Sequence, residues 1–541
     1  MSTRERDGAE IEWQLELQDL RPVLRWLEDE RGNGTAGVSL RHAATVTHVD
    51  TYLDTADRRL DRAGYTVRIR RAPRLPTELT LKSLATVGQD ALRVRRELSQ
   101  ELSVDPGTTL PAIDGPVTAR VRALAGSRKL VALFDVRTHR RTFALGAGNG
   151  VTGQLALDDT VIHEAETGKV LGRLRRVEVE APEESVGAVR PLVENLQHAL
   201  GLQPAVLSKY EAALAASGHR RAESESFGPT SFGEDATAGQ VALAILRRHF
   251  AVLLAKEPGA RLGDEIEDLH EMRVATRRLR SAVALFEDVL PAEAGRQRPE
   301  LAWLAQTVGD VRDLDVEIDG LNRWIDVAPS GDLAGLARFR TLLETQRADA
   351  RASLLQALDS PRYDRFVRRF GSMLRSRSGT RTGAARTAVP TLVLQRQRQV
   401  EKWLKRVQQE HEPEAYHRLR IAAKRFRYSL EFLAGVYPRE TAAVVKRAVA
   451  LQDVLGAYQD GRVATQRLRE LAVSGADELG AEAVFAMGGL AEHYRAQMEA
   501  SLFQVEPLAR RLQRKAWKQL RKRLIAASDE RSSASDDVAP L

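Results

Sequence analysis

Residues 10–17, EIEWQLEL, alternate polar and apolar side chains without a break. Successive side chains of a β-strand point to opposite faces, so the segment predicts a strand with one polar and one apolar face. The polar face carries Glu10, Glu12, Gln14 and Glu16. Similar alternation recurs through residues 8–212, which we therefore expect to form mainly strands.

The later strands of this region carry cations as well as carboxylates on one face. Arg68 and Arg70 are two residues apart and would point to the same face of a strand. The same holds for Arg93, Arg95 and Glu97. If the strands close into an antiparallel barrel with these faces inward, the lumen is a polar tunnel. The alternative is an amphipathic sheet whose charged face is solvated. Because both signs recur on several strands, we favour the barrel.

A tunnel lined by both signs of charge suits a metal-bound triphosphate. Carboxylate oxygens bind Mg²⁺ or Mn²⁺. Arginine and lysine neutralise phosphate oxygens and the charge that develops when a phosphoryl group is transferred. The metal can also orient or activate a water molecule.

Six short motifs in this region resemble, in order and spacing, those of the CYTH, or triphosphate tunnel metalloenzyme, family. Glu10-x-Glu12 matches the start of the family signature Glu-x-Glu-x-Lys. The other motifs are YLDTADRRLDRAGYTVRIR (52–70), LTLK (79–82), LALDD (155–159), VEVE (177–180) and SKY (208–210). The resemblance covers residues 8–215 and implies a triphosphate tunnel.

The resemblance also implies roles for individual residues. The metal ligands would be Glu10, Glu12, Asp158, Glu178 and Glu180, of which Glu10 and Glu12 would also be catalytic. The triphosphate ligands would be Arg68, Arg70, Lys82, Arg140 and Lys209, and we add Arg95 for its position on the charged face. Arg141 and Asp159 are the neighbouring alternatives to Arg140 and Asp158.

The chain departs from the signature at one position, where Gln14 replaces the lysine. Glutamine carries neither charge nor a titratable proton. Two functions therefore stay open for the barrel: a metal-dependent triphosphatase, which is a phosphoanhydride hydrolase, and a non-catalytic module that binds or targets polyphosphate. A class IV-type adenylate cyclase is a third, although the sequence shows no nucleoside pocket.

From residue 237 onward, the apolar period becomes helical, and two basic segments resemble each other. They are HEMRVATRRLR (270–280) and HRLRIAAKRFR (417–427). On a helix, each segment aligns one histidine and three cations along a face. The aligned residues are His270, Arg273, Arg277 and Arg280 in the first, and His417, Arg420, Lys424 and Arg427 in the second.

The offset of 147 residues between His270 and His417 recurs further along the chain. It also relates LAQTVGDVRDLDV (304–316) to LQDVLGAYQDGRV (451–463), pairing Asp313 with Asp460. Two motifs at one offset indicate an internal duplication. We expect two related helical bundles with pseudo-twofold symmetry.

Like charges at helical spacing repel each other, so a basic row requires a neutralising partner. Guanidinium groups bind phosphate oxygens bidentately, and two facing rows would form a groove for a chain of phosphates. The alternative is a solvated basic face that pairs internally with carboxylates. These would be Asp310, Asp313, Asp315, Asp453 and Asp460, of which we expect Asp313 and Asp460 to orient arginines.

The two basic segments resemble the CHAD family, named for conserved histidines in an α-helical domain. The resemblance spans residues 237–525 and implies that these segments bind inorganic polyphosphate. The binding residues would be His270, Arg273, Arg277, Arg278, Arg280, His417, Arg420, Lys424, Arg425 and Arg427. A CHAD domain often follows a CYTH domain, which is the order expected here.

Breaks in composition suggest the domain boundaries. We predict an α+β chain with a barrel domain and flanking helices at 8–215, a linker at 216–236, an all-α domain at 237–526 and a disordered tail at 527–541. The helical halves would be 237–370 and 391–526, joined by a basic loop.

The composition narrows the function further. The chain has 82 Lys and Arg against 74 Asp and Glu, and it has no cysteine, which excludes disulfides and thiolate metal sites. Aromatic residues make up 5%, too few to favour base stacking, so nucleic acid is an unlikely partner and inorganic polyphosphate or a small triphosphate is favoured. Without a recognisable signal or membrane segment, we expect a cytoplasmic protein, at polyphosphate granules where these exist, with no membrane partner.

Overall fold

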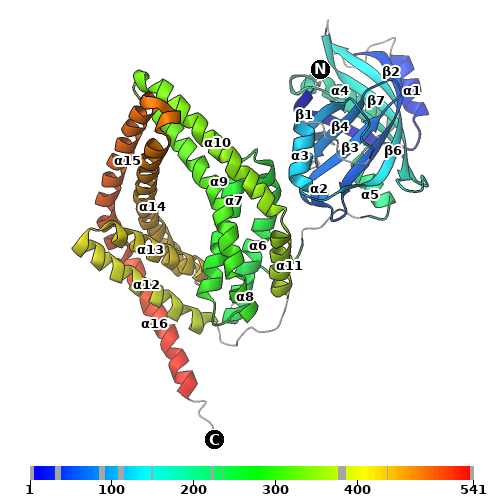
Figure 1. The fold of residues 1–541 in the computed structure, drawn as a ribbon. Helices are drawn as coiled ribbons and strands as arrows, with labels where there is room; N and C mark the ends of the chain where they lie inside the picture. Colours follow the sequence, from blue (N-terminus) through cyan, green and yellow to red (C-terminus); the bar gives the residue numbers. More distant parts are fainter. Residues whose placement is uncertain are drawn as a thin grey trace. The chain divides into compact units, whose positions relative to one another are not determined.

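The computed structural model describes residues 5–30, 38–84, 92–107, 115–147, 150–219, 221, 225–233, 236–375, 385–434 and 437–536. The chain divides into two compact units, Met1–Ser224 and Glu225–Leu541. The first unit is built on strands and the second on helices (Figure 1). The division falls inside the segment 216–236, for which the sequence predicts a linker.

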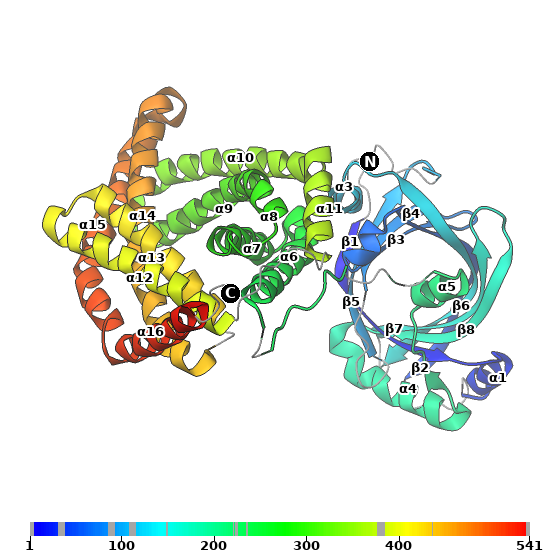
Figure 2. The ribbon, with the colours of Figure 1, turned by 90° about the horizontal axis from the view of Figure 1, so that it is seen from below.

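Within the described residues of the first unit, eight antiparallel strands close into a barrel. Their order is β5-β4-β3-β2-β6-β7-β8-β1, and β1 also pairs with β5 to complete the ring (Figure 2). The strands are β1 (Glu5–Glu16), β2 (Ser39–Thr55), β3 (Tyr65–Arg71), β4 (Thr77–Ser83), β5 (Leu92–Leu102), β6 (Leu130–Ala147), β7 (Gly150–Glu164) and β8 (Val170–Glu180), with the short β9 (Gln203–Pro204) beside β1. The predicted barrel is therefore confirmed.

Helices cover the outer face of several strands. The helices of this unit are α1 (Arg21–Glu30), α2 (Arg59–Arg62), α3 (Pro116–Ala125), α4 (Val186–Leu200) and α5 (Lys209–Ala216), with a 3₁₀ turn at Glu183–Ser185. Trp13 of β1 and Val179 of β8 are buried in one cluster with Leu27 of α1 and Leu192 of α4. Burying one such leucine stabilises the fold by about 1.5–3 kcal/mol. Because strand side chains alternate, the polar face of β1 is turned toward the lumen.

The helix α5 fills one end of the barrel. Its Tyr210 and Leu214 are buried against inward-facing aromatic and aliphatic side chains, which include Tyr52 of β2 and Phe134 of β6. Figure 2 shows α5 inside the ring of strands. A capping box formed by Ser208 starts the helix, so the next residue, Lys209, is placed at the inner end of the tunnel.

The second unit is built mainly of long helices. The first half contains α6 (Ala238–Leu262), α7 (Ile266–Leu285), α8 (Ala292–Arg296), α9 (Arg298–Ile325), α10 (Leu333–Leu358) and α11 (Pro361–Arg375), with a 3₁₀ turn at Ser330–Asp332. The second half contains α12 (Ala385–Glu410), α13 (Pro413–Leu433), α14 (Pro438–Ser474), α15 (Ala476–Leu512) and α16 (Lys515–Asp536).

The helix bounds repeat at the offset found in the sequence. The helices α6 and α12 begin at Ala238 and Ala385, and α7 and α13 begin at Ile266 and Pro413. Each pair is separated by the same 147 residues as His270 and His417. The duplication of motifs is therefore also a duplication of helices.

The helix α6 satisfies the length and hydropathy of a membrane span, with a mean hydropathy of 1.3 over its most apolar window. However, 61% of that window is buried inside the helical unit. Val241, Leu246 and Phe250 are fully buried and belong to the main helical core. These contacts are those of a core helix, and a buried core helix can have the same length and hydropathy as a membrane span.

Helices extend into two segments that the sequence predicts as irregular. The helix α11 continues to Arg375 because Phe370, Met373 and Leu374 keep helical spacing and are buried in the core. The helix α12 begins at Ala385, so it also covers part of the predicted loop 371–390. Similarly, α16 runs to Asp536, past the start of the tail predicted at 527–541.

Candidate functional sites: a charged tunnel and a basic pocket

The barrel encloses a tunnel of about 320 Å³ with both signs of charge on its wall. Of the described residues that line it, six are cations and six are carboxylates. The cations are Arg68, Arg70, Lys82, Arg95, Arg140 and Lys209, and the carboxylates are Glu10, Glu12, Glu78, Glu97, Glu178 and Glu180. The structure thus brings together in one lumen all six predicted triphosphate ligands and four of the five predicted metal ligands.

One cluster in the tunnel is centred on Glu10. Lys82 Nζ lies 2.8 Å from Glu10 Oε2, and Arg95 Nε donates to the same oxygen at 2.8 Å. Lys82 also lies 2.8 Å from Glu97, and Arg95 forms an ion pair with Glu12. Burial raises the pKa of Glu10, but the charges of Lys82 and Arg95 outweigh this and hold the pKa well below its usual value.

A second cluster is centred on Asp158, which is fully buried behind the lining residues. Arg140 donates to Asp158 through Nε at 2.8 Å and through Nη2 at 2.7 Å, and it also pairs with Glu178. Lys209 pairs with Asp158 and lies 2.9 Å from Glu178. Although burial opposes the shift, Lys209 and Arg140 lower the pKa of both carboxyl groups.

A third cluster contains Asp50, which the sequence analysis did not single out. Arg70 donates to Asp50 at 2.7 and 2.8 Å, and Arg68 approaches it at 3.4 Å. Asp50 is 2% exposed, and despite its burial, Arg70 and Arg68 hold its pKa far below the usual value. Asp50 lies opposite Arg70 in the pairing of β2 with β3. Asp50 and Tyr52 are two residues apart and therefore share a strand face, which is the sequence signal that could have placed Asp50 in the tunnel.

Gln14 occupies the middle of the carboxylate side of the tunnel. Its Nε2 donates to Glu12 Oε1 at 2.8 Å and to Glu178 Oε1 at 3.3 Å, so one neutral amide joins two carboxylates. A lysine here would add a positive charge between them. Without that charge, burial dominates and raises the pKa of Glu12 to about 7, against the opposing charge of Arg95.

The oxygen donors of the tunnel fit a hard divalent cation by type. The predicted metal ligands Glu10, Glu12, Glu178 and Glu180 line the lumen, and Asp158 lies directly behind it. Carboxylate oxygens are the ligands that Mg²⁺ and Mn²⁺ prefer. In the described part of the chain, however, no three carboxylate or imidazole groups are arranged to hold a metal ion. Instead, most of these carboxylates are paired with tunnel cations.

The structure distinguishes the neighbouring alternatives left open by the sequence. Arg140 lines the tunnel and pairs with Asp158, whereas Asp159 lies 3.6 Å from Arg175 and is 40% exposed. Arg141 alternates with Arg140 and therefore lies on the opposite face of β6. Of the remaining predicted ligands, Glu180 accepts a hydrogen bond from Gln154, and burial raises its pKa.

Two buried arginines hold the segment that precedes α5. Arg93 and Arg176 are each 1% exposed. Arg93 donates to the Ala205 carbonyl at 2.7 Å, and Arg176 donates to the Leu207 carbonyl at 2.7 Å. Both contacts position Lys209 in the tunnel. The sequence analysis noted the parity of Arg93 but assigned it no role.

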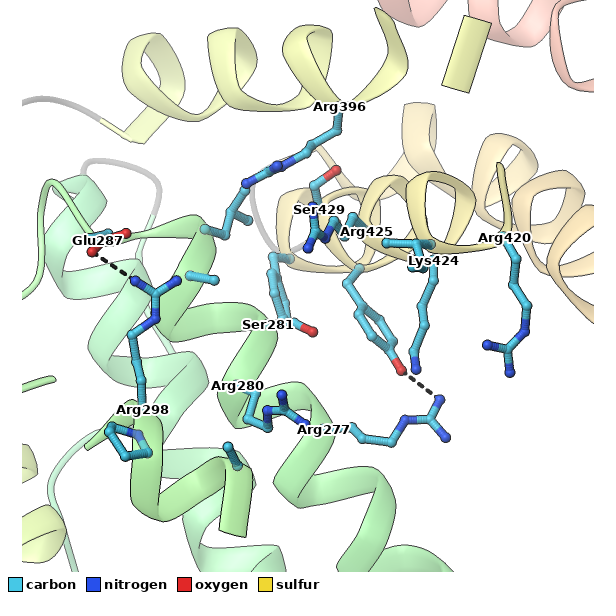
Figure 3. Close-up of a pocket in the computed structure, with 17 residues that line it drawn as sticks. Arg277, Arg280, Ser281, Glu287, Arg298, Arg396, Arg420, Lys424, Arg425 and Ser429 are labelled. Atoms are coloured by element: carbon cyan, nitrogen blue, oxygen red, sulfur yellow. Dashed lines mark hydrogen bonds and ion pairs between the residues drawn. The ribbon is translucent and has the colours of Figure 1, made fainter. Parts of the chain in front are cut away.

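The helical unit contains a larger cavity, of about 770 Å³, between α7, α9, α12 and α13 (Figure 3). We call it the basic pocket. Its cations are Arg277, Arg280, Arg298, Arg396, Arg420, Lys424 and Arg425. Glu287 is the only carboxylate among its described lining residues, and it pairs with Arg298 at 2.8 Å. The pocket therefore has a large excess of positive charge.

Equivalent residues of the two halves meet in this pocket. Arg277 and Lys424 are related by the 147-residue offset and line the same cavity (Figure 3). Arg277 donates to the Tyr428 hydroxyl at 3.1 Å. Burial and the charges of Arg277 and Arg420 lower the pKa of Lys424 to about 7. After burial, the main causes of this shift are the charges of neighbouring arginines, which disfavour the charged form of the amine.

The other predicted polyphosphate ligands lie outside the pocket lining. His270 contacts Arg312, and His417 contacts Gln459 at the equivalent position of the second half. Arg273 pairs with Asp313 at 2.5 Å, and its equivalent in the second half, Arg420, which does line the pocket, approaches Asp460 at 3.8 Å. Arg278 and Arg427 both form an ion pair with the same carboxylate, that of Glu431.

Sequence reasoning missed two arginines of the pocket. Arg298 starts α9 and Arg396 lies on α12, outside both basic segments. Neither is part of the duplicated motif, so no signal in the sequence joined them to it. Only the packing of α9 and α12 beside α7 and α13 brings them to the site.

A closed antiparallel tunnel barrel with charged walls, followed by a duplicated helical domain with a basic pocket, defines the class of this chain. Family models identify the two parts. A CYTH domain model matches residues 28–211, and a CHAD domain model matches residues 244–469. The chain therefore contains a CYTH domain followed by a CHAD domain, as the motif resemblance predicted.

Solved structures resemble each part. The CHAD domain from the plant Ricinus communis is 28% identical, with 54% of this chain and 98% of that one covered and a TM-score of 0.46. PptA from Streptomyces chartreusis is 19% identical, covering 51% of this chain and all of that one, with a TM-score of 0.43. HpAC1 from Hippeastrum, a putative adenylyl cyclase described as having a dominant triphosphatase activity, is 23% identical. That match covers 39% of this chain and 96% of HpAC1, with a TM-score of 0.29. A search of curated proteins finds no match.

Proposed function

We propose that this chain binds inorganic polyphosphate through its helical domain and that its barrel holds a triphosphate group and hydrolyses it with a divalent cation. The observation that carries the proposal for the barrel is the tunnel wall itself, on which six cations face six carboxylates. Phosphate oxygens need the cations, and a divalent metal needs the carboxylates. Few other ligands use both sets at once.

The basic pocket supports polyphosphate as the second ligand. Its lining combines seven cations with a single carboxylate among the described residues, so the neutralising charge has to come from a bound anion. Guanidinium groups bind phosphate oxygens through paired hydrogen bonds, and a chain of phosphates presents such oxygens at every unit. The cytoplasm, including polyphosphate granules, is the location that we propose for this activity.

In the tunnel, Glu10, Glu12, Glu178, Glu180 and Asp158 would hold Mg²⁺ or Mn²⁺. When bound, the metal would neutralise phosphate charge and lower the pKa of a coordinated water. The arginines and lysines of the chain would then bind the phosphate oxygens. Because these carboxylates pair with the tunnel cations, a metal held by them would leave the cations free for the substrate.

A non-catalytic barrel is the second candidate, and Gln14 is the observation that favours it. The amide joins Glu12 to Glu178 where the family signature places a lysine. The tunnel would then bind the end of a phosphate chain without cutting it.

Phosphate release by the full chain separates the two candidates. We would measure it from tripolyphosphate with Mg²⁺ and with Mn²⁺, using wild type, Gln14→Lys, and Glu12→Gln as the isosteric inactive control. The proposal expects metal-dependent release by wild type that Glu12→Gln abolishes. Release by Gln14→Lys alone identifies the non-catalytic barrel, and no release by either protein contradicts hydrolysis altogether.

A further inference from the structure

A second basic groove lies between α12 and α13, with a volume of about 460 Å³. Its wall carries four arginines, Arg396, Arg398, Arg418 and Arg425, together with the ring of Trp403. Arg398 and Arg418 do not line the basic pocket. Neither belongs to the residues to which the sequence assigned polyphosphate binding.

This groove is continuous with the basic pocket. Arg396 and Arg425 line both cavities, so the same two guanidinium groups form the border between them. Figure 3 shows Arg396 on α12 and Arg425 on α13 among the residues that line the basic pocket. Burial and the charge of Arg425 lower the pKa of Arg396, which shows that the two like charges are close.

The charge of the groove is poorly neutralised by the protein. Arg418 pairs with Glu414 one turn earlier on α13, at 2.7 Å and with both side chains more than half exposed. Among the residues that the structure describes, Arg396, Arg398 and Arg425 have no ion pair with a carboxylate. Exposed helical pairs such as Arg418–Glu414 contribute little to stability, so Arg418 is readily available to another anion.

We propose that the groove between α12 and α13 is a second subsite for the same phosphate chain, which enters it from the basic pocket across Arg396 and Arg425. The inference rests on the proposed binding of polyphosphate. Short chains fill the basic pocket alone, whereas long chains extend into the groove and contact Arg398 and Arg418. Affinity therefore rises with chain length in two stages.

A phosphate chain fits the groove better than a nucleic acid does. The groove shares two of its four arginines with a pocket whose lining is dominated by cations rather than by exposed aromatic rings. Trp403 is the one aromatic ring on the described wall of the groove. Single-stranded nucleic acids are typically held by several stacked bases in a row. An oligonucleotide is nevertheless included in the test, because Trp403 could stack one base.

The test uses the full chain and two matched double variants. Arg398→Gln/Arg418→Gln removes the two arginines specific to the groove. Lys405→Gln/Arg406→Gln is the control, since both residues are exposed on α12 outside the two cavities and Arg406 pairs with Glu410 as Arg418 does with Glu414. Unfolding curves of both variants would show that the fold is retained. Affinities for long-chain and short-chain polyphosphate would be measured without divalent cations, at several salt concentrations.

The proposal expects the groove variant to bind long-chain polyphosphate on the order of tenfold more weakly than the control, with a shallower salt dependence and unchanged short-chain affinity. If the groove variant binds long-chain polyphosphate as tightly as the control variant does, the subsite proposal is wrong. It is also wrong if the groove variant loses only its affinity for the oligonucleotide. If the wild type binds neither short-chain nor long-chain polyphosphate, the proposed function fails as well. A third variant, Arg277→Gln/Lys424→Gln, separates the two failures, because it weakens both chain lengths only if the basic pocket is the primary site.

Discussion

Among the residues that the structure describes, the tunnel has six cations and six carboxylates, whereas the basic pocket has seven cations and one carboxylate. In the tunnel, Lys82 lies 2.8 Å from Glu10 and Arg140 lies 2.7 Å from the buried Asp158. Pocket cations lie mainly beside one another, and Lys424 has a pKa lowered to about 7 by burial and by Arg277 and Arg420. Both regions suit phosphate, but for different reasons.

The difference determines what each site needs before it can bind an anion. In the tunnel, the cations already have internal partners, so under the proposed function a divalent metal would have to occupy the carboxylates before phosphate could use the cations. In the pocket, only Arg298 and Arg420 pair with a carboxylate among the described residues, so most of the cations are available at once and an external polyanion relieves their mutual repulsion. Removing one positive charge should therefore have opposite effects on stability in the two regions.

In the tunnel, Arg140→Met should destabilise the barrel strongly. The change leaves the fully buried Asp158 and the buried Glu178 with only Lys209 as a close cationic partner. Breaking a buried ion pair in this way costs about 3–5 kcal/mol. Denaturant unfolding followed by a barrel signal, such as the fluorescence of Trp13 or Trp26, would measure the loss. A stability within 1 kcal/mol of wild type, which is about the median contribution of a surface ion pair, would contradict the tight internal pairing.

At the end of the tunnel, Arg176→Met should have a smaller effect. The substitution removes the donor to the Leu207 carbonyl and the donor to the buried amide oxygen of Gln14, at a cost of about 1–3 kcal/mol. Hydrogen exchange should accelerate in α5 and in residues 205–208 more than in the strands. The exposed Arg173 of the same strand supplies a control, Arg173→Met, for which exchange in α5 should be unchanged.

In the basic pocket, Lys424→Met should stabilise the helical domain near neutral pH. The folded pKa of Lys424 is about 7, below the usual 10.5, so the unfolded chain binds more protons between these values. Stability of the wild type then rises with pH through this window, because raising the pH removes the cost of the buried charge. The variant should unfold about 2–4 °C higher than wild type at pH 6, and the gap should close toward pH 10. A variant less stable than wild type at pH 6 would show that Lys424 is neutralised internally.

Binding of polyphosphate should also draw a proton to Lys424. An anion in the pocket restores the ordinary preference of the amine for its charged form, so at pH 7.5 the wild type takes up less than one proton on binding. Calorimetry in buffers of different ionisation enthalpy measures this uptake. Lys424→Met should abolish it, whereas Lys405→Met, at an exposed position of α12, should not. Equal uptake by all three proteins would assign the proton to another group.

Sequence periodicity predicted both folds because each rests on a repeating pattern. The period of two placed Glu10 and Glu12 on the polar face of one strand and Arg95 on the polar face of another, and barrel closure follows from many strands with that pattern. The constant offset from His270 to His417 predicted two related bundles, and the helix starts repeat at the same offset.

The pairing of charges could not be predicted in the same way. Asp50 meets Arg70 through the register of β2 with β3, and Glu431 draws Arg278 and Arg427 away from the pocket through the packing of α7 on α13. Such contacts depend on three-dimensional neighbours that no local pattern encodes. Arg298 and Arg396 also reach the pocket through helix packing, and neither lies in the motifs that the two halves of the helical domain share.

Hydrogen exchange of the full chain with long-chain polyphosphate, in the presence of EDTA and then of Mg²⁺, compares the two regions in one protein. Our account predicts that polyphosphate with EDTA protects α7 and α13 but leaves β1 and β8 unchanged, and that tripolyphosphate with Mg²⁺ protects the barrel strands. Protection of the strands by the phosphate chain without a metal would contradict the account, as would unchanged exchange in α7 and α13.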